Sequence, residues 1–327
     1  MKNLNLTNIL IFAVVVLIAT NSVSAVLNMR ASAASFIKWV SFTPSLAALE
    51  KAYKTDTETK NEEWHLKMFE TLAYYSSLKG DNYKSFDGKV IDELTARLKN
   101  GERFSDITGK LKNYSYYKES YMAVLKEFTG EFAENKENKY GLKVYSPIAS
   151  GYWFSHTKDF GNGRSYGFDR KHLGNDLFGS VGTPIVSVES GVVEEVGWNR
   201  YGGWRVGIRS FDGKRYYYYA HLRRDRPYNE NVKIGEVISA GEVIGYLGAT
   251  GYSDKENVNG MKVPHLHFGM QLIFDESQKD GNGEIWIDVY NIVRFLSKHR
   301  SEVVKNSETG EYKRKYDFYE KNLSLAE

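Results

Sequence analysis

Two short segments of the chain carry imidazole and carboxylate groups at spacings that suit a metal ion. His172 and Asp176 lie on either side of Gly174, and a turn at this glycine can direct both side chains to one centre. His265 and His267 occupy alternate positions of a β-forming run, so on a strand both imidazoles project from one face. Because imidazole and carboxylate are both zinc ligands, the two segments together indicate a zinc site.

Each segment alone also has a simpler interpretation. A histidine and an aspartate at the spacing of His172 and Asp176 occur often by chance, and an aspartate commonly stabilises a turn. The pair His265 and His267 would also fit the exposed polar face of a surface strand. The metal interpretation is favoured for the histidine pair because clustered histidines are typical of metal sites.

A third segment, Tyr217–Leu222, is rich in tyrosine and contains His221 near its end. Strict alternation along a strand would place Tyr217, Tyr219 and His221 on one face. A lone histidine in such a place is more often structural, so its weight comes from the two segments above. We expect His221 to join the zinc site, and the Tyr219 hydroxyl to lie beside it.

The chain contains no cysteine, which excludes thiolate ligands, a cysteine nucleophile and disulfide bonds. Any metal must therefore be held by histidine, aspartate or glutamate. Three of the seven histidines are not expected to be ligands. His65 is expected to be a surface or half-buried helix residue, and His299 to lie at a solvated helix end. His156 is expected in an exposed loop, with a substrate contact as the alternative.

Composition and charge are those of an ordinary folded protein. The 327 residues are 42% hydrophobic and 26% charged, and the length suits two domains. The net charge of +3, carried by scattered basic residues, gives no reason to expect nucleic acid as a partner.

The N-terminus has the features of an export signal. Residues 9–19 are uninterrupted apolar residues, too few for a membrane span of about 20 residues. They suit the core of a signal peptide over residues 1–25, with Val23-Ser24-Ala25 as the cleavage site. An uncleaved membrane anchor through residues 9–19 is the alternative. Both predict an extracellular location, either secreted or associated with the cell envelope.

The elements around these segments predict an α+β protein with a helical bundle ahead of a compact antiparallel β domain. Residues 36–135 show helical periodicity, for example at Val90–Leu98, with Asp87 as N-cap and Gly101 as the stop. A run from Tyr117 to Phe132 has the same spacing, which predicts three to five helices. No residue of this helical domain identifies a chemistry; a protein partner is one role it could have.

From residue 140 the sequence changes to short β-branched and aromatic runs between glycine-rich turns, which indicates an antiparallel β domain over residues 140–297. The charged segment Glu134–Lys139 is expected to mark its boundary. The charged tail, residues 301–327, is expected to be solvated. The expected strands are Ile185–Val188, Val192–Val196, Arg205–Ile208, Arg215–Ala220, Val243–Leu247 and His265–Ile273, followed by a strand and a helix within residues 284–298.

These motifs, in this order, resemble the lysostaphin or LytM-type zinc metallopeptidases, a family with a duplicated hybrid motif fold. The resemblance covers residues 140–297 and includes the segment Gly241–Gly245. It implies an exported zinc peptidase that hydrolyses peptide bonds of bacterial peptidoglycan. It also implies roles for five residues: His172, Asp176 and His267 as zinc ligands, and His265 and His221 as catalytic residues.

The chemistry of the residues agrees with this resemblance. Three protein ligands leave a fourth zinc position for water, as catalytic sites require. His265, beside a ligand on the same face, is expected to act as general base, and His221 to stabilise the oxyanion and protonate the leaving amine. Three segments depart from the family pattern, so substrate preference is not implied: Tyr252–Val263, Asp275–Gly283 and the turn at Ser210–Gly213.

Two other functions fit parts of the sequence. The chain could be an envelope scaffold or partner-binding module that uses a lysostaphin-like domain with little or no activity, and the unexplained helical residues favour this alternative. A cupin-like metal barrel would need a glutamate soon after the histidine pair, whereas Glu276 lies nine residues after His267. That fold would also leave His172 and Asp176 unexplained.

Overall fold

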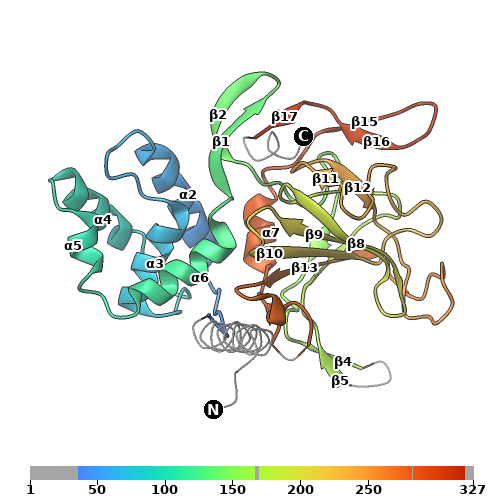
Figure 1. The fold of residues 1–327 in the computed structure, drawn as a ribbon, viewed down its shortest axis with the longest axis horizontal. Helices are drawn as coiled ribbons and strands as arrows, with labels where there is room; N and C mark the ends of the chain where they lie inside the picture. Colours follow the sequence, from blue (N-terminus) through green and yellow to red (C-terminus); the bar gives the residue numbers. More distant parts are fainter. Residues whose placement is uncertain (1–35, 166–168, 282, 321–327) are drawn as a thin grey trace, which may run out of the picture. The chain divides into compact units, whose positions relative to one another are not determined.

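The computed structural model describes residues 36–165, 169–281 and 283–320 (Figure 1). The predicted export signal, residues 1–25, lies outside them. Among the described residues, no helix is both long enough and apolar enough to cross a membrane. The chain combines α-helices with antiparallel sheet, as its sequence predicts.

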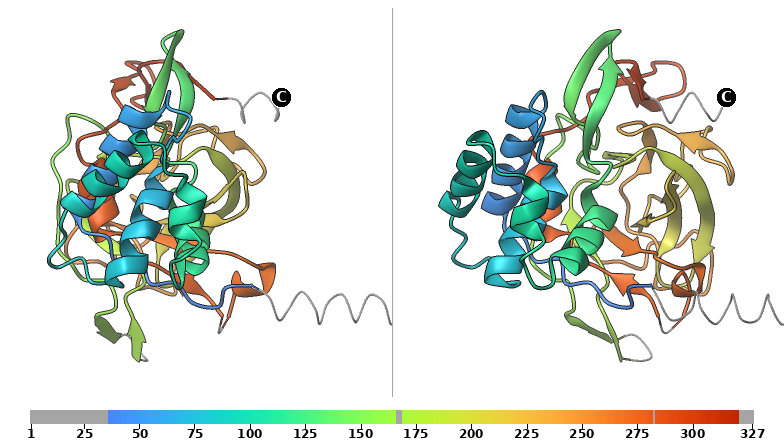
Figure 2. Two further views of the ribbon diagram at one scale, coloured as in Figure 1. Left: turned by 90° about the vertical axis from the view of Figure 1, so that its left-hand side faces the viewer. Right: turned by 60° about the vertical axis from the view of Figure 1, so that its left-hand side comes forward.

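Within residues 36–128, five helices precede the first described strand. Helix α2 begins where the Ser45 side chain accepts a hydrogen bond from the amide of Ala48, which satisfies one of the free donors of the first turn. Helix α3 packs against both α2 and α6 (Figure 2). Each of the three helices contributes a buried side chain: Leu49 from α2, Leu72 from α3 and Tyr121 from α6. The helices are α2 (Leu46–Thr59), α3 (Met68–Lys79), α4 (Lys89–Lys99), α5 (Phe104–Thr108) and α6 (Tyr114–Leu125).

The sequence located helix α4 but misplaced the end of α6. Asp87 accepts from the amide of Lys89 just before α4, and Gly101, at φ 90°, follows its last turn. Helix α6, in contrast, ends at Leu125. Phe132 lies on a strand, so the prediction that it continues the helical run is wrong.

That strand, β1 (Thr129–Glu134), pairs with β2 (Glu137–Leu142) in a hairpin. The two residues of the turn, Asn135 and Lys136, have φ of 51° and 66°. A two-residue turn with positive φ at both positions matches the twist of the flanking strands. The charged segment expected to be a boundary loop is therefore the tip of this hairpin.

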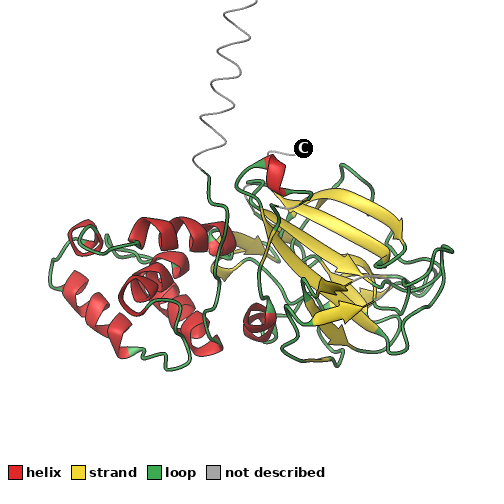
Figure 3. Cartoon of the chain, turned by 90° about the horizontal axis from the view of Figure 1, so that it is seen from below, coloured by secondary structure: helices red, strands yellow, loops and turns green. Residues whose placement is uncertain are grey.

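The site is built on one antiparallel sheet; strands are yellow in Figure 3. The strand order is β11-β8-β9-β10-β13-β6-β3, and β14 pairs with the end of β13. The expected strands are present, with ends that differ by a few residues. The members are β3 (Ser155–His156), β6 (Asn175–Phe178), β8 (Gly191–Asn199), β9 (Gly203–Ser210), β10 (Arg215–Ala220), β11 (Val237–Ile238), β13 (His265–Leu272) and β14 (Ile285–Trp286).

A buried ion pair anchors β10, the strand that leads to His221. The Arg215 guanidinium donates to both carboxylate oxygens of Glu189, at 2.8 and 3.0 Å, and to the carbonyl of Ala123 in α6, at 2.7 Å. Tyr217 donates its hydroxyl to the same carboxylate. Because Arg215 is fully buried, these charge-assisted bonds are needed to hold its charge, and they fix the start of the strand.

The C-terminal residues are more ordered than their charge suggests. Three short strands occur between residues 303 and 319, and Phe318 packs against the buried ring of Tyr145. This part of the tail is therefore ordered, although residues 302–319 are all half-buried or exposed, as a solvated tail would be. The remaining elements are β4 (Gly163–Ser165), β5 (Asp169–Lys171), β7 (Pro184–Val186), β12 (Val243–Tyr246), a 3-10 turn (Glu276–Gln278), α7 (Tyr290–Leu296), β15 (Val303–Lys305), β16 (Tyr312–Arg314) and β17 (Phe318–Tyr319).

Candidate metal centre

The pairing of β13 with β6 brings the two predicted halves of the site together. His267 lies directly opposite Asp176 in the register of these strands. The neighbours of His267 on its own strand, Leu266 and Phe268, are fully buried on the other face of the sheet, as alternation predicts. Gly174 permits the close approach of the two segments, because a Cβ there would lie 2.7 Å from the His267 ring.

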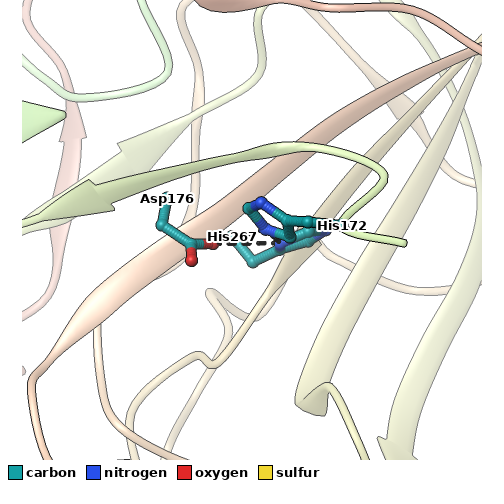
Figure 4. A group of neighbouring side chains, drawn as sticks. All are labelled: His172, Asp176 and His267. Atoms are coloured by element: carbon teal, nitrogen blue, oxygen red, sulfur yellow. Dashed lines mark hydrogen bonds and ion pairs between the residues drawn. The ribbon is translucent and has the colours of Figure 1, made fainter. Parts of the chain in front are cut away.

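Three donor atoms converge at this point (Figure 4). His172 Nε2 lies 2.9 Å from Asp176 Oδ1 and 2.8 Å from His267 Nδ1. The third side of the triangle, from His267 Nδ1 to Asp176 Oδ1, measures 3.1 Å. Among the described residues, this is the one group of three His, Asp or Glu side chains arranged to hold a metal ion.

The donor set fits a zinc ion. One proton can form a hydrogen bond between only two of the three atoms, whereas a metal cation can bind the lone pairs of all three. Ligands of tetrahedral zinc lie about 3.3 Å apart, close to the separations of 2.8–3.1 Å found here. His172 also has its other nitrogen, Nδ1, 3.1 Å from the carbonyl of Asp159, so a proton on Nδ1 leaves Nε2 free for a metal.

Three residues near the triangle, Asp159, Arg164 and Asn175, were not singled out as site residues from the sequence. Arg164, on β4, donates to Asp176 Oδ2 at 3.3 Å and to Asp159 Oδ2 at 3.2 Å. Asn175 donates to the other oxygen of Asp159. These contacts orient the carboxylate of Asp176 and the ring of His172, yet no motif spacing connects residues 159 and 164 to the histidines.

The titration of His172 predicts a proton release on metal binding. Burial alone would lower the pKa of His172, but hydrogen bonds to Asp159 and Asp176 raise it to about 9. Burial likewise would raise the pKa of Asp176, but hydrogen bonds from His172 and His267 hold it well below its usual value. The metal-free cluster is therefore a protonated imidazole beside a carboxylate.

We expect zinc to displace about one proton near pH 7, because His172 must lose its Nε2 proton to become a ligand. The apparent zinc affinity should rise about tenfold per pH unit and level off near pH 9. Calorimetric titration in buffers of different ionisation enthalpy measures the number of protons released. A binding enthalpy that is the same in every buffer would contradict this protonation state.

The two other predicted histidines face the same centre. His265 Nδ1 lies 2.8 Å from the carbonyl of Val263, and His221 Nδ1 lies 2.8 Å from the carbonyl of Thr250. These carbonyls can only accept, so each Nδ1 carries a proton and each Nε2 presents a lone pair. The two rings are 4.7 Å apart, and His265 Nε2 is 3.8 Å from Asp176 Oδ1.

His221 reaches the centre by a route that alternation did not predict. Strand β10 ends at Ala220, and His221 has φ 60°, a left-handed conformation that is uncommon for a residue with a Cβ. This turn moves its side chain to the face of Tyr218 and Ala220, where it lines the groove. Burial, followed by repulsion from His265 and His267, lowers the pKa of His221 well below its usual value, so the imidazole is neutral.

The expectation that the Tyr219 hydroxyl joins the cluster is wrong. The Tyr219 ring is fully buried against Phe268, and its hydroxyl accepts from the amide of Val188 at 2.9 Å, on the core side of the sheet. Tyr218 occupies the groove side instead, with its ring 5.9 Å from that of His267.

Replacing Tyr219 with phenylalanine should therefore affect stability and not catalysis. The buried amide of Val188 loses its acceptor, which costs about 1–3 kcal/mol in the free energy of unfolding. Urea denaturation measures this loss, and assays of the folded variant measure activity. Unchanged stability together with a large loss of activity would show that the Tyr219 hydroxyl takes part in catalysis.

A groove of about 520 Å³ contains the centre. Arg170, Tyr201 and Tyr252 line one part of it, beside His221. Another part is lined by Glu195, Lys279, Asp280, Glu284 and Trp286. Tyr252 and Met261 belong to the segment noted as a departure from the family pattern, so that segment forms part of the groove wall.

The three remaining histidines lie outside the cluster. His65 lies between α2 and α3, not on a helix, with Nε2 2.8 Å from the buried carboxylate of Asp56. His156 is half-buried on β3 and bonds the side chain of Asn175. His299 stacks on Tyr145, so it is not at a solvated helix end.

Comparisons with known proteins agree with this geometry. Residues 170–280 match the profile of peptidase family M23. The L-Ala--D-Glu endopeptidase of Bacillus subtilis is 37% identical over 161 residues, 49% of this chain and 47% of the relative. The glycyl-glycine endopeptidase ALE-1 of Staphylococcus capitis is 40% identical over 98 residues, 30% of this chain and 24% of the relative. The chain thus spans less than half the length of these curated relatives.

A solved structure supports the fold over a longer stretch. The crystal structure of a proposed glycyl-glycine endopeptidase LytM from Ruminococcus gnavus superposes with a TM-score of 0.50 and 23% identity. The alignment covers 77% of this chain and 91% of that one. The two proteins therefore share their overall fold.

Proposed function

We propose that this chain, whose residues 170–280 form a peptidase family M23 domain, is a zinc-dependent endopeptidase that cuts peptide bonds in bacterial cell-wall peptidoglycan. The observation that carries the proposal is the convergence of His172 Nε2, Asp176 Oδ1 and His267 Nδ1 in a groove. The relatives are named for bonds to D-glutamate or between glycines, and D-amino acids are characteristic of bacterial cell walls.

Zinc bound at this centre would act as a Lewis acid and lower the pKa of a water molecule to about 7. The residues around the zinc site accept and donate the protons of the reaction. His265 accepts the water proton at Nε2, because its Nδ1 proton is held by the carbonyl of Val263. Arg164 and Asp159 keep the ligands Asp176 and His172 in place throughout.

His221 stabilises the oxyanion of the substrate and protonates the leaving amine. It can donate from Nε2 only after gaining a proton, because Nδ1–H is committed to the carbonyl of Thr250. Burial keeps the free imidazole neutral, but a negative charge that develops in the groove would favour its protonated form. The source is the proton that His265 takes from the water: it passes to His221, whose ring lies 4.7 Å from that of His265, and then to the leaving amine, so that both imidazoles are neutral again.

The domain organisation and location are part of the proposal. Residues 140–297 form the zinc peptidase domain with a duplicated hybrid motif, and the helices within residues 36–135 form a bundle ahead of it. Residues 1–25 direct export, so that the enzyme meets its substrate outside the cytoplasm. Cell-wall peptide is extracellular, and a protein without cysteine needs no oxidative folding there.

The experiment compares metal-stripped and zinc-reconstituted protein on purified peptidoglycan from several species. We expect one zinc per chain, new amino termini only in the reconstituted sample, and loss of activity with a chelator. A fully loaded protein that releases no new amino termini from any wall would overturn the proposal and favour the envelope scaffold.

A further inference from the structure

Among the residues that the structure describes, one arginine of the groove has no carboxylate to neutralise it. The other guanidinium groups of the groove are paired: Arg164 with Asp159 and Asp176, and Arg205 with Glu195. Arg170, on β5, makes no ion pair with any described residue. A cation in a concave groove without a counter-charge attracts anions.

Arg170 is nevertheless held in a defined position. Its guanidinium carbon lies 5.0 Å from the ring centre of Tyr201 and 5.3 Å from that of Tyr252, and it donates to the Tyr252 hydroxyl. Contacts with two aromatic faces hold an arginine without using up its charge. Its Nε is buried and has no hydrogen-bond partner within the described part of the chain.

The second tyrosine connects this arginine to the reaction centre. The Tyr252 ring stacks on the His221 ring at 6.0 Å, with 22° between the planes. Tyr252 has φ 49°, a conformation in which its segment turns toward the groove. The guanidinium of Arg170 is thus one side chain away from His221. Because an extended peptide advances about 3.5 Å per residue, a group bound there lies within about three residues of the scissile bond.

We propose that Arg170, Tyr201 and Tyr252 form a subsite for a substrate carboxylate, which makes the enzyme select peptides that carry a free acid near the scissile bond. This inference rests on the function proposed above and specifies its substrate. Of the two bonds for which the relatives are named, only the one to D-glutamate brings a side or main-chain acid with it, so the subsite favours that kind of bond over a glycine bridge.

The charges elsewhere in the groove would orient a bound peptide. Glu195, Asp280 and Glu284 line a different part and would repel an anion. A substrate carboxylate is therefore stabilised at the Arg170 end of the groove, where Lys171 adds a second positive charge and the planar guanidinium can offer paired donors. Peptides would bind with their acidic residue toward Tyr252.

The test uses one peptidoglycan preparation with free stem-peptide carboxylates, assayed before and after these acids are converted to amides. Zinc-loaded full-length protein should release new amino termini about tenfold faster from the untreated wall. The variant Arg170→Gln should lose this preference: its rate falls about tenfold on the untreated wall and changes less than about twofold on the amidated wall.

Arg200→Gln is the matched control. Arg200 also lies over the Tyr201 ring, at 5.1 Å, but it pairs with Asp254 and is not part of the groove wall. The Arg200→Gln variant removes one positive charge near Tyr201 but leaves the groove wall unchanged. Its rates on the untreated and the amidated wall should therefore both equal those of the wild type. Bound zinc, measured for every sample, should remain one per chain, which shows that the neighbouring ligand His172 is intact.

Three results would overturn the subsite while leaving the peptidase function in place. The wild type would cut both walls at the same rate, or Arg170→Gln would slow both walls equally, as a purely structural role predicts, or Arg200→Gln would lose the same preference. Failure of the wild type to cut either wall would instead count against the proposed function itself.

Discussion

Replacing His267 with alanine is expected to abolish zinc binding and peptidase activity together. His267 Nδ1 is one corner of the triangle with His172 Nε2 and Asp176 Oδ1, so two protein ligands would remain. Loss of a residue that only hydrogen-bonds a metal ligand costs about 10–100-fold in metal affinity. Loss of the ligand itself should therefore cost more than about 100-fold in zinc affinity. Equilibrium dialysis against zinc buffers measures the affinity, and release of amino termini from peptidoglycan measures activity.

His299→Ala provides the control for this variant. It removes another half-buried imidazole, which packs on Tyr145 and not on the metal centre. Zinc content and activity should stay at wild-type values. A His267→Ala protein that is folded and still binds zinc as tightly as the wild type would show that the ligand set has been misassigned.

Replacing His265 with alanine should separate chemistry from metal binding. Its Nε2 is 3.8 Å from Asp176 Oδ1, farther than the 2.8–3.1 Å that separates the ligand atoms from one another. Zinc should therefore stay bound, while kcat falls by about 10²–10⁴-fold because the general base is lost. Metal analysis and kinetics on the same preparation test both parts.

The comparison of the two histidine variants decides their roles. If His265→Ala and His267→Ala lost zinc to the same degree, the division into base and ligand would be wrong. If His265→Ala kept both zinc and full activity, His221 or a group outside the cluster would have to accept the proton.

The ligand segments could be predicted because they follow local rules. The two-residue period of β13 places His265 and His267 on one face and buries Leu266, whatever the rest of the chain does. The approach of His172 to Asp176 needs only a short turn and a small residue at Gly174. Tertiary pairing of β6 with β13 then completes the triangle.

The resemblance placed His221 in the site, but the alternation rule could not predict how its side chain reaches the site, because that depends on a single backbone angle. Alternation fails at the first residue after β10, where φ of 60° turns the side chain to the opposite face. The same failure explains the misplaced Tyr219 hydroxyl. No sequence pattern marks a histidine with positive φ, because glycine and asparagine are the residues that usually adopt the left-handed conformation.

Other features were missed because they depend on contacts between distant parts of the chain. Phe132 continues the helical spacing of α6, but pairing of β1 with β2 makes it part of a strand. The charged C-terminal residues gain order from partners far away, as when Glu320 pairs with the buried amine of Lys143. Arg170 likewise acquires its position only when Tyr201 and Tyr252 come together around it.

The most direct test of the metal centre is anomalous diffraction at the zinc edge from crystals of the zinc-loaded protein. The account predicts one strong peak, about 2.0–2.2 Å from His172 Nε2, Asp176 Oδ1 and His267 Nδ1, with His221 and His265 facing it but not bound to it. A peak elsewhere, or one bound by a fourth protein side chain, would contradict a catalytic zinc site at these residues.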